Sequence, residues 1–90
     1  MLEKELIMET RIALIGIIVE DNKEADKLNY ILHEYRQYII GRMGLPYREK
    51  SVSIISIVID ASNDIISSLS GKLGMLKGIN VKTMYSKNKK

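Results

Sequence analysis

The chain has 90 residues, 46% of them hydrophobic and 28% charged, and its formal net charge is +3. This length suits one domain, the composition excludes a mostly disordered chain, and the absence of cysteine excludes disulfides, thiol catalysis and iron–sulfur ligation. The apolar run at residues 12–19 is far shorter than the about 20 residues of a membrane helix, and residues 1–8 lack the pattern of a secretory signal, so we expect a soluble, cytoplasmic protein.

The first expected strand is residues 10–20, TRIALIGIIVE, an apolar and β-branched stretch typical of a buried strand. Asp21 is a candidate N-cap, and Glu24 follows at the spacing of a capping box. A helix is predicted next, because apolar residues recur along one helical stripe: Ala25, Leu28, Ile31, Leu32 and Tyr35.

Residues 38–48, YIIGRMGLPYR, contain two glycines and the only proline. Both residue types weaken a central strand, so we expect an edge strand that bends or bulges near Gly41 and Gly44. After a turn at Glu49 and Lys50, residues 51–60, SVSIISIVID, form a second strongly apolar strand.

Ser62 is a candidate N-cap of a second helix, and Gly78 is its natural stop. The apolar stripe of this helix comprises Ile65, Ile66, Leu69, Leu73 and Leu76. Gly71, Gly74 and Gly78, where this helix joins the next strand, allow a close backbone approach either of the helix to a neighbouring element or of a ligand, and we favour packing. Residues 79–85 alternate between apolar and polar, which predicts the last strand.

The element order predicts an α+β, ferredoxin-like βαββαβ domain over residues 10–86, between an extension at residues 1–9 and a basic tail at residues 87–90. In this fold a four-stranded antiparallel sheet carries two helices on one face, and the first and third strands are central. The basic tail accounts for the net charge, so a nucleic-acid footprint is weak. The two central strands also lack aromatic residues for stacking bases.

Both faces of the two central strands are apolar. In the first strand, Ile12, Leu14 and Ile18 point opposite to Ala13, Ile15, Ile17 and Val19. In the third strand, Val52, Ile54 and Val58 point opposite to Ile55, Ile57 and Ile59, and one of the two faces carries no helix. An apolar patch of this size usually marks an interface. A second copy could cover the patch face to face or extend the sheet at its edge, and a different protein could also cover it. We expect a homo-oligomer, because self-association is the commonest solution.

No catalytic machinery can be assembled from these residues. His33 is the only histidine, and no set of residues has metal-ligand spacing, so we predict neither enzyme, nor metal, nor cofactor. Arg42, Tyr47 and Arg48 lie in the unusual glycine-containing segment and are our candidates for an anionic-ligand site between subunits. The alternative is a bent edge strand whose arginines form ion pairs at a subunit boundary.

Three stretches, TRIALIGIIVED, YIIGRMGLPYRE and SGKLGMLKGINVK, resemble the family of proposed iron-only hydrogenase system regulators. The resemblance implies an ACT-like domain similar in shape to the C-terminal domain of the nickel-responsive repressor. Such domains form dimers or tetramers and often bind small effectors between subunits. One histidine and no cysteine do not support nickel sensing, the loop at residues 20–23 lacks the glycine of amino-acid-binding ACT domains, and we expect no ribbon-helix-helix segment.

The sequence therefore predicts a regulatory module of the hydrogenase system, with a small effector or a protein as its partner. The alternative is a non-catalytic interaction or assembly factor.

Overall fold

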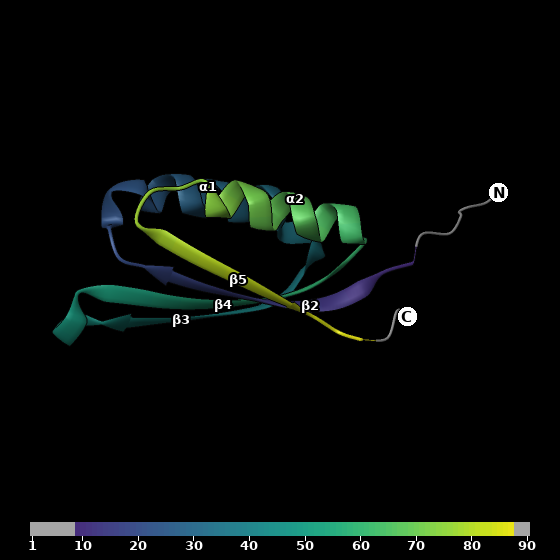
Figure 1. The fold of residues 1–90 in the computed structure, drawn as a ribbon, viewed down its shortest axis with the longest axis horizontal. Coiled ribbons are helices and arrows are strands. Elements are labelled where there is room, and N and C mark those ends of the chain that lie inside the picture. The colour runs from purple at the N-terminus through teal and green to yellow at the C-terminus, as the bar shows by residue number, and fades with distance from the viewer. Residues whose placement is uncertain (1–8, 88–90) are drawn as a thin grey trace.

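The computed structural model describes residues 9–87 (Figure 1), so the expected extension up to residue 8 and the tail from residue 88 lie outside the described residues. Its strands and helices are β2 (Arg11–Val19), α1 (Ala25–Glu34), β3 (Ile39–Tyr47), β4 (Val52–Ala61), α2 (Asn63–Gly74) and β5 (Ile79–Tyr85). Short 3-10 turns connect them: η1 (Asn22–Glu24), η2 (Arg36–Tyr38) and η3 (Arg48–Lys50). This order is the expected βαββαβ.

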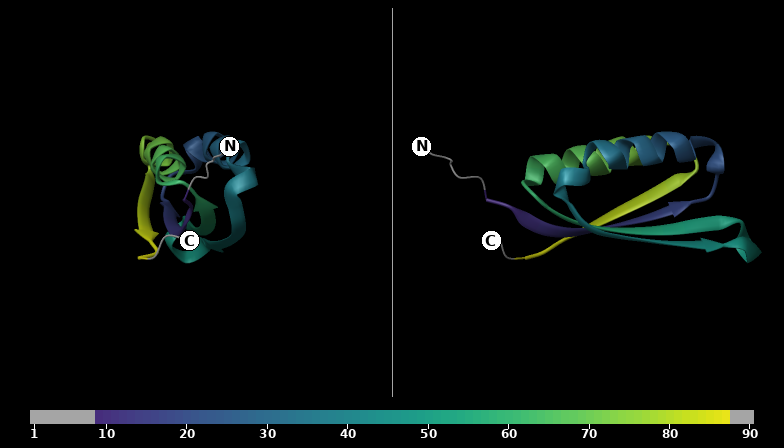
Figure 2. Two further views of the ribbon diagram at one scale, coloured as in Figure 1. Left: turned by 90° about the vertical axis from the view of Figure 1, so that its right-hand side faces the viewer. Right: turned by 180° about the vertical axis from the view of Figure 1, so that it is seen from behind.

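The four strands form one antiparallel sheet in the order β3-β4-β2-β5. The first and third strands of the fold, β2 and β4, are therefore central, as the apolar composition predicted. Figures 1 and 2 show α1 and α2 side by side on one face of this sheet, while the other face carries no helix from the part of the chain that the structure describes. The ferredoxin-like prediction is confirmed.

The core lies between the sheet and the helices. Alternate residues of the central strands point into it, because successive side chains of a strand face opposite sides. Its buried members are Ala13, Ile15, Ile17, Val19, Leu28, Leu32, Ile55, Ile57, Ile59, Ala61, Ile66, Leu69, Leu73 and Ile79. The apolar helix stripes predicted from the sequence supply the residues that cover the sheet in this core.

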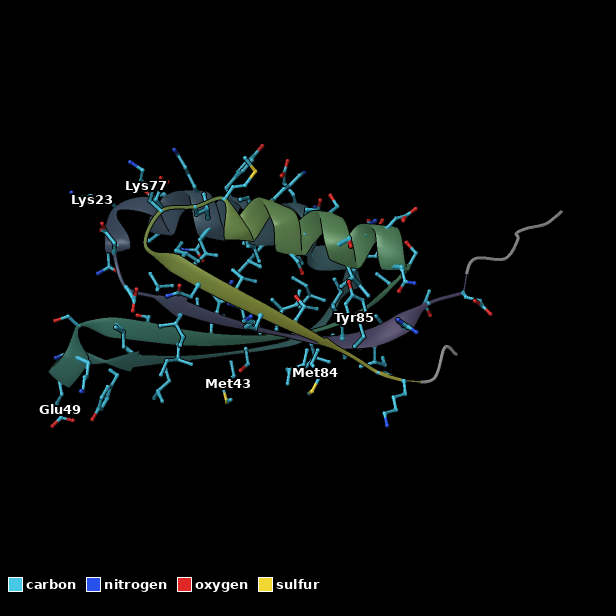
Figure 3. The ribbon with its side chains drawn as sticks, viewed as in Figure 1. Lys23, Met43, Glu49, Lys77, Met84 and Tyr85 are labelled. Atoms are coloured by element: carbon cyan, nitrogen blue, oxygen red, sulfur yellow. The ribbon has the colours of Figure 1, made fainter. Side chains whose placement is uncertain are left out.

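The edge strand β3 departs from a regular ladder near its start. Its pairing with β4 shifts register between Ile39 and Gly41, which is the irregularity expected near Gly41. The pairing is regular through Gly44, so the second glycine introduces no bulge. β3 and β4 continue as a hairpin whose tip, at Glu49 in Figure 3, lies beyond the helix layer.

The capping box predicted at the first helix does not form. The Asp21 side chain accepts a hydrogen bond from the Lys23 amide at 3.0 Å, but this caps η1, and α1 begins only at Ala25. Glu24 instead accepts the Lys77 amide at 3.4 Å and pairs with Lys27 at 3.2 Å. The carboxylate therefore ties the start of α1 to the loop that follows α2.

The second cap forms as predicted. The Ser62 hydroxyl accepts a hydrogen bond from the Ile65 amide at 3.4 Å and begins α2.

Of the three glycines at the helix–strand join, only Gly78 is at a close approach. Its φ is +71°, and a Cβ there would overlap the Cβ of Asp21. The Gly78 carbonyl also accepts hydrogen bonds from the Glu20 amide at 2.7 Å and the Asp21 amide at 3.3 Å. Gly71 and Gly74 face open space, so the close packing expected at these two positions is wrong.

Substituting Gly78 should therefore destabilise the domain. Gly78→Ala combines a left-handed backbone with a steric overlap, and we expect a loss of about 1–3 kcal/mol, or several degrees in Tm. Gly71→Ala is the matched control, because an exposed helical alanine in open space should stabilise by about 0.5–1 kcal/mol. Thermal unfolding followed by circular dichroism at one protein concentration measures both, and equal effects would contradict the assignment.

Glu24 should make stability depend on pH. Hydrogen bonds from the Lys27 side chain and the Lys77 amide lower the pKa of the Glu24 carboxyl. A pKa that is lower in the folded state stabilises the fold above the unfolded pKa of about 4.3, and this contribution is lost as pH falls through the folded pKa. Glu24→Gln should thus lower Tm at pH 7 and have less effect at pH 3. The same substitution in a Lys27→Gln background should cost less at pH 7, and an effect independent of both pH and background would contradict this account.

Candidate functional site

The sheet face without helices exposes apolar side chains on all four strands, and on β5 Met84 shares this face with the polar Asn80 and Lys82. The register of strand pairing aligns the side chains of this face in rows across the sheet, and one row runs from Leu45 through Ile54 and Ile18 to Asn80. Figure 3 shows Met43 and Met84 pointing away from the helices on this face. We call this surface the bare face; its exposed large apolar side chains are Ile12, Leu14, Ile18, Met43, Leu45, Tyr47, Ile54 and Met84.

A hollow of about 270 Å³ lies in the middle of the bare face. The row across it contains Ser56 and Gly16, with Lys82 at the β5 end. Gly16 contributes no side chain, and Ile18 and Ile54 line the hollow next to it. The bare face is therefore a concave apolar surface with a small polar centre.

The bare face is close to electrically neutral. Among its strand residues within the described chain, the charged ones are Lys82, which pairs with Gly16, and Asp60, which pairs with Ile12. Both side chains are exposed. One positive and one negative charge do not make a phosphate-binding surface, which would need clustered lysine or arginine.

The three residues predicted to bind an anion do not share one site within a chain. Tyr47 pairs with Val52 and lies on the side of the bare face, whereas Arg42 pairs with the buried Ile57 and lies on the helix side. Arg48 follows in η3. The structure thus brings Tyr47 and Arg48 together and separates Arg42 from them.

Tyr47 and Arg48 line a hollow of about 360 Å³ next to the tip of the β3–β4 hairpin. Its other lining residues are Asn22, Pro46, Ser51, Val52 and Ser53. The hollow offers a phenol, a guanidinium and several hydroxyl and amide groups, a set suited to a polar or anionic ligand.

Arg42 lines a second hollow, of about 300 Å³, between α1 and β3. The other residues around it are Asn29, Leu32, His33, Arg36 and Ile39. Asn29, which forms a hydrogen bond with Arg42, and Arg36, which lines the same hollow, were not among the site residues predicted from the sequence. The signal was present, because Asn29, Leu32, His33 and Arg36 recur at helical spacing on one face of α1 and its continuation.

His33 is exposed on α1. No group of three or more histidine, aspartate or glutamate side chains in residues 9–87 is placed to hold a metal ion. Within the same residues, neither helix is long and apolar enough to span a membrane.

A family model described as "TM1266-like: Iron-only hydrogenase system regulator, putative" matches residues 11–83, which include every strand and helix of the fold except the last two residues of β5. The chain belongs to this family. The resemblance stated from the three sequence stretches is therefore confirmed. No curated protein matches the chain.

Solved structures agree with this assignment. TM1266, an uncharacterized protein from Thermotoga maritima, is 41% identical with a TM-score of 0.83, and the match covers 88% of this chain and all of that one. Two matches at low identity show the fold alone. A formyltetrahydrofolate deformylase from Pseudomonas putida has 11% identity, a TM-score of 0.58 and coverage of 81% and 28%. An unknown protein from Galdieria sulphuraria has 12% identity, a TM-score of 0.60 and coverage of 89% and 47%.

Proposed function

We propose that this family member is a non-catalytic regulatory module of the iron-only hydrogenase system that works in the cytoplasm as a homo-oligomer and senses a small effector at a subunit interface. The observation that carries the proposal is the bare face, in a chain whose family is described as regulatory. A free monomer would leave this apolar face in water.

The energetics favour covering the bare face. Ile12, Leu14, Ile18 and Ile54 keep between 38% and 42% of their surface exposed. Burying that fraction contributes about 1 kcal/mol per side chain, since complete burial contributes about 1.5–3 kcal/mol. A facing copy brings the same eight large apolar side chains a second time. Their combined burial can exceed the about 4–15 kcal/mol that association costs in lost freedom of motion.

A second copy is a suitable occupant for two further reasons. Because the charges of Lys82 and Asp60 are opposite, two copies of the bare face that meet do not repel each other by net charge. The hollow at Gly16 can receive a projecting side chain such as Met43 or Met84 from the facing copy, and methionine adapts well to such gaps.

The effector part of the proposal concerns Tyr47 and Arg48. Tyr47 lies at the end of the bare face and also lines the hairpin hollow. A copy covering the bare face would therefore close over one side of this hollow. Ligand sites at such boundaries allow a small molecule to change the association of subunits.

A second candidate function is an assembly factor whose bare face docks onto a different protein. The same exposed side chains support this alternative. A monomer in solution would favour it over the regulatory oligomer.

Placing a charge on the bare face should dissociate the oligomer. Leu14→Lys buries an unpaired ammonium in the proposed interface, and we expect the mass from light scattering during size exclusion to fall to that of one chain. Ser67→Lys adds the same charge at an exposed position of α2 and should leave the mass unchanged. A monomeric parent protein, or an oligomer that survives Leu14→Lys, would contradict association through this face.

An effector held by Arg48 should raise thermal stability. A ligand that contributes about 1–2 kcal/mol raises Tm by several degrees in a domain of this size. We expect a screen of anionic metabolites to yield such a shift, and Arg48→Gln to reduce it while Lys50→Gln, in the same turn, does not. If no metabolite shifts Tm, the effector part of the proposal is wrong and the oligomer stands by itself.

A further inference from the structure

The hollow between α1 and β3 is assembled from both elements by regular geometry. Asn29, His33 and Arg36 occupy successive turns of α1 and of η2, which follows it, so they lie along one side of the helix. The edge strand β3 runs beneath, and its register turns Arg42 toward the helices, opposite the buried Ile57. Two arginines from separate elements therefore line one hollow.

Neutral oxygens orient both guanidinium groups. The Arg42 Nη2 donates to the Asn29 side-chain Oδ1 at 2.9 Å. The Arg36 Nη1 donates to the His33 carbonyl at 2.9 Å. Each contact uses one of the five N–H donors of a guanidinium and leaves its charge in place. Neither arginine forms an ion pair with a carboxylate of residues 9–87.

The floor of the hollow is apolar. Leu32 is 2% exposed and Ile39 is half-buried against the core, so one wall excludes water. Charge-assisted hydrogen bonds are stronger beside such a wall than in open solvent. With a volume of about 300 Å³, the hollow is at the small end of the range for ligand sites.

We propose that this hollow is a binding site for a small oxyanion, a phosphate or carboxylate group, which the Arg36 and Arg42 guanidinium groups hold. Planar guanidinium forks match the oxygens of both groups and bind them through paired hydrogen bonds. This site is separate from the hairpin hollow of Tyr47 and Arg48, and it does not depend on association through the bare face.

The hollow suits a compact ligand rather than a nucleic-acid strand. A strand would need basic groups distributed along a groove. The two arginines instead line one small surface hollow, and Asn29 of α1 is the only described side chain that forms a hydrogen bond with Arg42.

The test uses inorganic phosphate as the probe, with the full-length protein at fixed ionic strength. Amide chemical shifts should move on phosphate addition at residues 29–42 and stay constant elsewhere. Arg36→Gln and Arg42→Gln should each weaken phosphate binding by about tenfold or more, because each removes charged hydrogen bonds. Arg42→Lys, which keeps the charge but loses the fork, should weaken it less than Arg42→Gln. Lys50→Gln removes one charge from the hairpin tip and should bind phosphate as the parent does.

Shifts scattered over all basic residues, or equal affinities of Arg36→Gln and Lys50→Gln, would overturn the proposal. A second titration with acetate distinguishes the two ligand groups, and a response to either one supports the site. The same samples report solution mass. Loss of phosphate binding in a variant that keeps the parent's mass separates this inference from the proposed oligomer, and a monomeric protein that still binds phosphate refutes only the latter.

Discussion

The structure depends on the pairing of β2 with β4, two strands that are apolar on both faces. Nine consecutive residue pairs, from Arg11 with Ala61 to Val19 with Ser53, form this ladder. One face of the ladder is the floor of the core beneath α1 and α2. The other face is not covered by any helix of residues 9–87, and its exposed apolar side chains are the reason we propose a partner there.

Much of the fold follows from short-range patterns in the sequence. The strands and helices were predictable because apolar residues recur every 2 residues along a half-buried strand and about every 3.6 residues along a helix. Ser62 also caps α2, as its position before the apolar stripe indicated. The failure of the capping box at α1 was not predictable, because Glu24 accepts a hydrogen bond from the Lys77 amide, which is distant in sequence. The spacing of neighbouring residues does not reveal that an amide from another part of the fold will bind the Glu24 carboxylate. For the same reason, the sequence could not show that Gly78 alone of three glycines meets another backbone.

The candidate site was predicted less well than the fold. Arg42 and Tyr47 are an odd number of positions apart in one strand, so their side chains face opposite sides of the sheet. Grouping them by closeness in sequence therefore joined two different surfaces. The actual neighbours of Arg42 come from α1, and the register of an edge strand with a bulge decides which of its residues meet that helix.

The irregular edge strand also limits how the sheet can grow. Strand β3 carries a register shift at its start and Pro46, which has no amide to donate, near its end. An incoming strand needs a continuous row of donors and acceptors, so this edge is a poor template for the addition of a further strand. The chain can therefore expose a wide apolar face for association, while the irregular β3 edge disfavours the strand-by-strand addition that would build a fibre.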